Sequence, residues 1–129
     1  MSKIITLLSS PQTVTASWAD IGSEITTDGY EDIGLWIKVT INNSQDVELR
    51  TQAKHESGGS DEYEMMTETI TAGLETEDPI VYELNRDQDQ DVYFHVPLRG
   101  EIPYLQVQVK AGTVGATGAT IDEIKYDLS

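Results

Sequence analysis

Apolar and polar residues alternate with a period of two along much of this chain, which is the pattern of strands with one buried face. The clearest stretch is 34–55, where two alternating runs are separated by the turn-forming residues 42–44. We expect these runs to form a β-hairpin, because residues with this turn chemistry between two alternating runs are typical of one. Its inward face would be core and consist of six aliphatic residues: Leu35, Ile37, Val39, Ile41, Val47 and Leu49.

Further alternating runs predict the remaining strands, and no stretch has a convincing helical period. These strands are expected at 3–9, 12–18, 24–26, 63–72, 80–84, 92–98, 104–110 and around 124–128. About eight or nine short strands with frequent turn signals indicate an antiparallel β-sandwich or barrel. The strand number and the long early connection favour a jelly-roll-like sandwich over an immunoglobulin-type one.

The length of 129 residues is that of one domain, large enough to bury a core. We therefore predict a single β-sandwich domain over 1–129. Within it, residues 1–11 form either an edge strand or an attachment arm, because they are apolar enough to pair with a neighbouring subunit. The N-terminal run is too short and too broken by Ser and Thr for a signal peptide or a membrane span, so a cytoplasmic site of synthesis is expected.

The net charge of the chain limits the classes of molecule that it is expected to bind. The chain has 23 acidic and 8 basic residues, a formal net charge of −15 and a pI near 4.2. Such a surface repels nucleic acid unless basic residues cluster locally, and here they are scattered, so we expect no nucleic-acid role. Since there is no cysteine, neither disulfides nor thiolate metal sites can stabilise the fold.

The outward face of the predicted hairpin is the one place where basic residues gather. Lys38, Arg50 and Lys54 would lie there around Trp36. We predict that this face docks onto an acidic neighbour. Charge reversal at Arg50 and Lys54 should then weaken attachment and leave the fold intact.

Candidate catalytic and metal-binding patterns are weak throughout. Residues 85–91 place Asn or Asp at every second position, but the glycine and distant Glu of a calcium loop are absent, so a solvated turn is the better interpretation. The two histidines, His55 and His95, are too few for a zinc site. Because no glycine-flanked serine elbow occurs either, we expect no enzyme, no catalytic residues, no cofactor and no metal.

Exposed aromatic residues are the more specific surface feature. Several Trp and Tyr residues fall at predicted outward positions, where sugar stacking or a protein interface would use them, although core filling explains most. The glycine-rich stretch 112–120 lacks the lysine and following helix of a phosphate-binding loop, and it is expected to be an ordinary loop.

Two long stretches carry a family resemblance. The run SWADIGSEITTDGYEDIGLWIKVTINNSQDVELRTQAKHESGGSDEY and the closing VPLRGEIPYLQVQVKAGTVGATGATIDEIKYDL resemble small virion proteins of tailed bacteriophages, of the capsid decoration or cement type. The resemblance implies a β-sandwich or jelly-roll protein on the capsid surface, assembled in the host cytoplasm, where it would stabilise capsomer junctions. Its partners would be the major capsid protein and copies of itself, commonly in homotrimers.

The resemblance contains no catalytic or binding motif, so the contact residues are predicted from the chain itself. We expect them on the hairpin face and the N-terminal segment, at Trp36, Lys38, Arg50, Lys54, Ile4, Ile5 and Leu7. Deleting residues 1–10 should leave a folded domain that no longer binds capsids. The alternative function is a carbohydrate-binding or fibre- or tail-associated β-sandwich module, in which a glycan is the partner; neither function involves a membrane.

Overall fold

The computed structural model describes the chain except for residues 1–2, 42–45, 72, 85–90, 99–101 and 113–118. The described residues form thirteen strands and no helix. The strands are β1 (Ile5–Leu8), β2 (Gln12–Thr13), β3 (Ala19–Asp20), β4 (Ile25–Thr26), β5 (Asp32–Thr40), β6 (Val47–Lys54), β7 (Tyr63–Glu64), β8 (Met66–Thr71), β9 (Leu74–Pro79), β10 (Tyr82–Leu84), β11 (Asp91–Pro97), β12 (Tyr104–Ala111) and β13 (Thr120–Leu128). Four of them have only two residues, which explains why the pattern predicted a smaller number.

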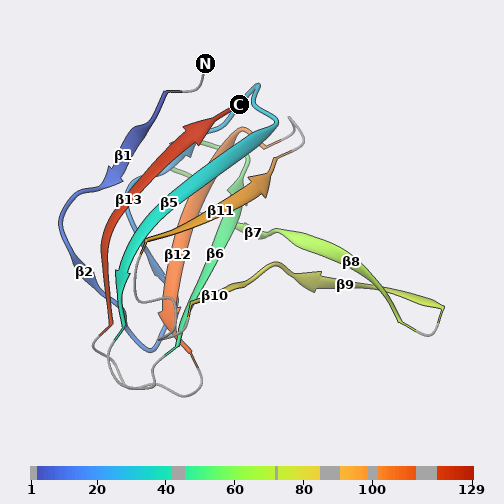
Figure 1. The fold of residues 1–129 in the computed structure, drawn as a ribbon. Coiled ribbons are helices and arrows are strands. Elements are labelled where there is room, and N and C mark those ends of the chain that lie inside the picture. The colour runs from blue at the N-terminus through green and yellow to red at the C-terminus, as the bar shows by residue number, and fades with distance from the viewer. Residues whose placement is uncertain (1–2, 42–45, 72, 85–90, 99–101, 113–118) are drawn as a thin grey trace.

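Two antiparallel sheets pack against each other, so the predicted all-β sandwich is confirmed (Figure 1). Sheet A has the order β1-β13-β5-β11, with β2 also paired to β13. Sheet B has the order β10-β6-β12-β3, with β4 paired to β12 and β7 to β6. The jelly-roll arrangement stays a prediction.

The predicted hairpin over 34–55 is wrong. Its two strands are β5 and β6, and β5 pairs with β13 and β11 in sheet A, whereas β6 pairs with β12 and β10 in sheet B. The chain therefore passes from one sheet to the other between these strands; the predicted turn at 42–44 lies outside the described residues. Alternation shows which face of a strand is apolar, but it does not show whether the next strand lies beside it or opposite it across a core.

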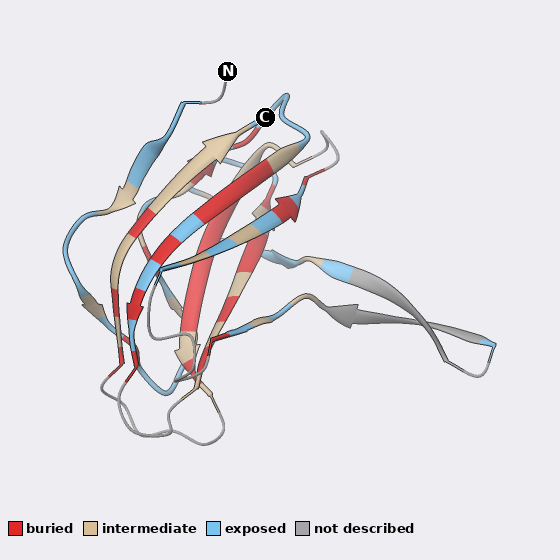
Figure 2. Cartoon of the chain, viewed as in Figure 1, coloured by how far each residue is buried: buried red, intermediate tan, exposed pale blue. Residues whose placement is uncertain are grey.

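The predicted core, by contrast, is confirmed. All six aliphatic residues of the two runs are at most 4% exposed, because the two apolar faces meet across the sandwich. Figure 2 shows the buried positions concentrated on β5, β6 and β12. The inward residues of β12 also belong to this core: Leu105, Val107 and Val109.

Residues 5–8 form β1, an edge strand of sheet A that pairs with β13 of the same chain. Ile4 and Ile5 are exposed, whereas Leu7 is half-buried and packs against the core. The Leu7 side chain lies close against Gly22, since a Cβ at Gly22 would be only 2.5 Å from Leu7 Cγ. Gly22 also has a φ of +70°. Glycine suits both the close approach and the left-handed backbone.

A two-stranded arm, residues 66–79, leaves the sandwich (Figure 1). The predicted strand over 63–72 is realised as β7 and β8, and β9 was not predicted because Leu74–Pro79 is acidic with a single aliphatic residue. At the base of the arm, the Ile80 amide donates a hydrogen bond to the Met65 carbonyl at 2.8 Å. We refer to this segment as the β8–β9 arm.

Candidate functional site

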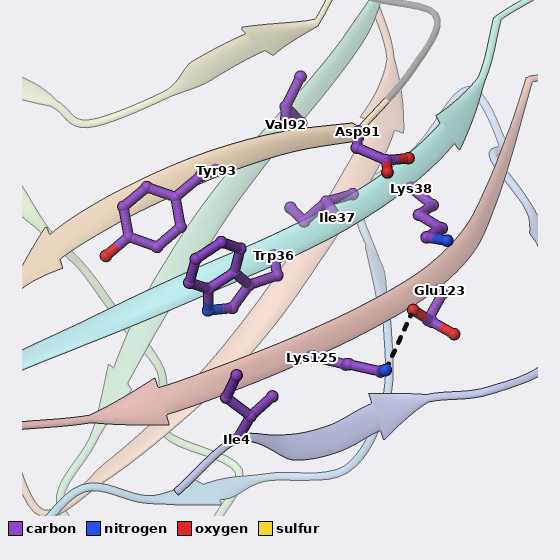
Figure 3. A pocket seen from close by; sticks show the side chains of 9 residues that line it. All are labelled: Ile4, Trp36, Ile37, Lys38, Asp91, Val92, Tyr93, Glu123 and Lys125. Carbon is purple, nitrogen blue, oxygen red and sulfur yellow. Dashed lines mark ion pairs between the residues drawn. The ribbon is translucent and has the colours of Figure 1, made fainter. Parts of the chain in front are cut away.

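A groove of 380 Å³ crosses the outer face of sheet A and is the candidate site (Figure 3). Its lining residues come from β13, β5 and β11 of sheet A and from Ile4, the residue just before β1. Three of the predicted contact residues lie in it: Ile4, Trp36 and Lys38. Its other lining residues are Ile37, Asp91, Val92, Tyr93, Glu123 and Lys125.

Strand register brings these side chains together. Trp36 on β5 lies opposite Tyr93 on β11 and Lys125 on β13. One step further along β5, Lys38 lies opposite Asp91 and Glu123. Directly opposed residues on one sheet face are close enough to interact, so two rows of three side chains form the groove.

The first row contains an exposed aromatic pair. The ring centroids of Trp36 and Tyr93 are 4.5 Å apart at an interplanar angle of 55°, and the residues are 45% and 49% exposed. The indole Nε1 of Trp36 donates a hydrogen bond of 2.7 Å to Oδ2 of Asp127. The ring is therefore held both by a neighbouring ring and by a hydrogen bond, while much of its surface faces solvent.

Gly34 makes room for this pair. It lies two residues before Trp36 on β5, in register with His95 and Asp127. A Cβ at this position would lie 2.7 Å from Tyr93 Oη and 2.9 Å from Asp127 Oδ1. The hydroxyl end of Tyr93 thus occupies the space that a side chain at residue 34 would fill.

A β-bulge in β13 shapes the other side of the groove. The register shifts between Ile121 and Glu123, so that both Ile121 and Ile124 are buried although they are three residues apart. Asp122, at the bulge, accepts hydrogen bonds from Thr40 at 2.6 Å and Thr120 at 2.8 Å. The bulge places Glu123 opposite Lys38, and such irregularities are common beside functional sites.

Charges in the groove balance. Lys38 and Lys125 face Asp91 and Glu123, in a protein whose overall charge is −15. Lys125 Nζ lies 3.8 Å from Glu123 Oε1, as Figure 3 shows, and Lys38 makes no ion pair with any residue that the structure describes. The groove therefore offers both ammonium donors and carboxylate acceptors to a ligand.

The remaining predicted contact residues do not lie on this face. Ile5 and Leu7 belong to β1 but do not line the groove. Arg50 and Lys54 project from β6 on the outer face of sheet B, so the predicted single basic face does not form. The wrong hairpin pairing is the cause, because it placed residues of two different sheets side by side.

Arg50 is held within its own chain. Its Nε donates to Gln108 Oε1 at 2.9 Å, and its Nη1 lies 3.2 Å from Glu64 Oε1. Its guanidinium lies 4.2 Å from the ring centroid of Trp18, a cation–π arrangement. Two of its five N–H donors and one face of its guanidinium are thus engaged within the chain.

Lys54 is almost fully buried and pairs with Glu24, with Nζ to Oε1 at 2.7 Å. Its ammonium lowers the pKa of the Glu24 carboxyl, aided by hydrogen bonds from Ser57 and Gly58, and the Glu24 carboxylate in turn raises the pKa of Lys54. Reversing the charge of Lys54 would place two carboxylates together in a half-buried site. In place of the intact fold expected from the sequence, we therefore predict that this substitution destabilises the fold.

The two histidines lie apart. His95 Nε2 is 2.8 Å from Asp32 Oδ1 at the end of β11, and His55 contacts Tyr63 beyond the end of β6. Among the described residues, no group of three His, Asp or Glu side chains is arranged to hold a metal ion. Most of the calcium-like stretch, 85–90, lies outside those residues, as do 113–118 of the glycine-rich loop.

Sequence analysis missed Tyr93, Asp127 and Gly34 as parts of the site. The alternation of apolar and polar residues puts Tyr93 and Asp127 at outward positions of their strands. Only the pairing of β5 with β11 and β13 brings these residues next to Trp36. A signal did exist, because Gly34 lies within a strand of alternating apolar and polar residues, and such a glycine often marks a close approach.

Comparison of the chain with protein-family models and with curated proteins finds no match. In the part of the chain that the structure describes, no helix has the length and apolar character needed to cross a membrane.

Proposed function

We propose that this chain is a non-enzymatic structural protein of a virion, a capsid decoration protein that acts on the head surface as an oligomer, with a homotrimer favoured. Its partners are the major capsid protein and copies of itself. The observation that carries the proposal is the β8–β9 arm, which leaves the sandwich and pairs only within itself among the described strands.

An isolated two-stranded hairpin is at best marginally stable in water. The β8–β9 arm extends beyond the sandwich (Figure 1), and its strands form a separate two-stranded sheet. A second surface is needed to stabilise such an element. A protein present in many copies on one shell supplies that surface repeatedly, either from its own neighbours or from the shell beneath.

The composition of the arm favours a basic partner surface. Residues 66–79 contain four acidic residues and no basic one: Glu68, Glu75, Glu77 and Asp78. Opposite charges across an interface raise the rate of encounter and fix the orientation of the partners. The exposed Ile4 and Ile5 at the edge of sheet A provide a second contact of the kind expected for the N-terminal segment.

Removing the arm tests the proposal. Because Met65 and Ile80 are hydrogen-bonded at its base, replacing 66–79 by Asn-Gly closes the chain with a tight turn. We expect a sandwich that unfolds as cooperatively as the wild type but is monomeric in analytical ultracentrifugation. It should also lose saturable binding to heads purified from the virus that encodes the chain.

An unchanged oligomer together with unchanged head binding would contradict the proposal.

The location of the protein in the particle provides the second test. Labelled antibody should find the protein on the head surface of purified particles; labelling on the tail, or absence from the particle, would also contradict it.

A further inference from the structure

We propose that the groove over sheet A is a saccharide-binding site, in which a pyranose ring of a neutral oligosaccharide stacks on Trp36. This inference goes beyond the assembly role, because it depends on the outer face of sheet A and not on the β8–β9 arm. Its starting point is the aromatic pair.

The side chain of an exposed tryptophan normally rotates at little cost in free energy, but the Trp36 ring is held in one orientation. Its Nε1–H is tied to Asp127 at 2.7 Å, and one side of its ring contacts Tyr93. Its orientation is thus set before any ligand arrives. A rigid aromatic platform loses little side-chain entropy on binding, which is the general advantage of a preorganised site.

Gly34 shows that this arrangement requires a specific sequence. A Cβ at Gly34 would lie 2.7 Å from the Tyr93 hydroxyl, so the position of the Tyr93 ring depends on a glycine inside β5. Glycine weakens a strand interior. Gly34 thus weakens β5 locally, and the aromatic pair that it makes room for stays partly exposed in the folded chain.

The polar groups beside the platform match a ligand with many hydroxyls. Lys38 and Lys125 supply donors, and Asp91 and Glu123 supply acceptors, all within the groove that contains Trp36 (Figure 3). Each sugar hydroxyl both donates and accepts hydrogen bonds, so a mixed set suits it. Since the four charges cancel, the groove selects a neutral sugar over a charged one.

The size of the groove agrees with this assignment. Its 380 Å³ lies near the lower end of the roughly 300–1,000 Å³ usual for small-molecule sites. Sites of this kind combine an apolar or aromatic floor with a few fixed polar groups. The groove has both, with Ile4 at one end and Tyr93 at the other.

Binding to immobilised neutral oligosaccharides tests the proposal. The probes are cellohexaose, maltohexaose, laminarihexaose, chitohexaose and β-1,4-galactohexaose, with affinities of the positive ones measured by isothermal titration calorimetry on the full chain. We expect at least one to bind. Trp36→Ala should weaken that binding about tenfold or more, as for truncation of a central aromatic anchor.

Two further variants separate stacking from a general loss of structure. Tyr30→Ala is the matched control, because Tyr30 is 42% exposed and does not line the groove, and it should bind as the wild type does. Trp36→Phe keeps an aromatic ring but loses the hydrogen bond to Asp127, so it should bind with an intermediate affinity.

Binding of none of the five probes up to 5 mM, as a rough limit of detection by calorimetry, would overturn the proposal. Equal binding by Trp36→Ala would also overturn it. So would self-association of the wild type that Trp36→Ala abolishes in ultracentrifugation, because the groove would then be an interface between copies. Loss of oligomer on removing the arm leaves these results unaffected, so the two proposals fail separately.

Discussion

The outer faces of the two sheets have the same alternating sequence pattern but opposite environments. On sheet A, the outward residues Trp36 and Tyr93 are nearly half exposed and line an open groove. On sheet B, the outward residues Gln106 and Gln108 are only 5% and 7% exposed. An outward position in a sandwich is therefore a solvent position only where no other segment of the chain covers it.

The cover over sheet B is a set of polar contacts. Gln108 Nε2 donates to Asp20 at 2.8 Å and to Glu62 at 3.0 Å, and its Oε1 accepts from Arg50. Gln106 donates to the Gly22 carbonyl at 3.2 Å. Segments before β4 and around β7 are thereby attached to the sheet, so this face stabilises the fold whereas the face of sheet A is free to bind.

The largest expected effect is that of Gln108→Leu. It removes an acceptor of Arg50 and a donor to two carboxylates at a nearly buried position, so it should lower the free energy of unfolding by about 1–3 kcal/mol. Urea denaturation measures this. The matched substitution on sheet A, Lys125→Leu, should change stability by no more than about 0.5 kcal/mol. Equal losses would mean that the two faces do not differ.

The ion pair of sheet B gives a pH dependence. Because Lys54 lowers the pKa of Glu24 below its ordinary 4.5, the pair stabilises the folded state above about that pH and loses its effect as the pH falls through the folded-state pKa. Glu24→Gln should therefore be less stable than the wild type at pH 7, and the difference should shrink towards pH 3. Denaturation across this range measures it, and a constant difference would contradict the assignment.

The effect on stability that we expect at Gly34 lies at the lower end of the range given for Gln108→Leu. Gly34→Ala should push Tyr93 off the strand and remove most of its contact with Trp36, which corresponds to about 1 kcal/mol. The indole resonance of Trp36 should shift in an NMR spectrum. In a double-mutant cycle with Tyr93→Ala, the two losses should not add; additive losses would show that residue 34 does not position Tyr93.

Features that depend on residues close together in the chain could be predicted from the sequence, whereas features that depend on residues far apart could not. Period two depends only on neighbouring residues, and it correctly predicted the strands of the core and the inward positions of Leu35, Val47 and Leu105. Strand partners depend on residues far apart in the chain. Trp36 pairs with Lys125, 89 residues away, and nothing in the 34–55 stretch itself indicates this.

The same distinction explains the outcome for the candidate site. Trp36 and Lys38 are two residues apart on β5, and the groove brings them together as predicted. Arg50 and Lys54 were grouped with them only through the incorrect hairpin. The burial of Gln106 and Gln108 could not be predicted either, because it depends on segments that cross the sheet from elsewhere.

The central place of β13 in sheet A has a consequence for how the protein forms. β13 lies between β1 and β5, so β1 has no partner, and β5 has only β11, until residues 120–128 have left the ribosome. Until then, one hydrogen-bonding edge of β5 stays unpaired. Folding dominated by such distant pairings takes roughly milliseconds to seconds, and the nascent chain is prone to aggregation during that interval.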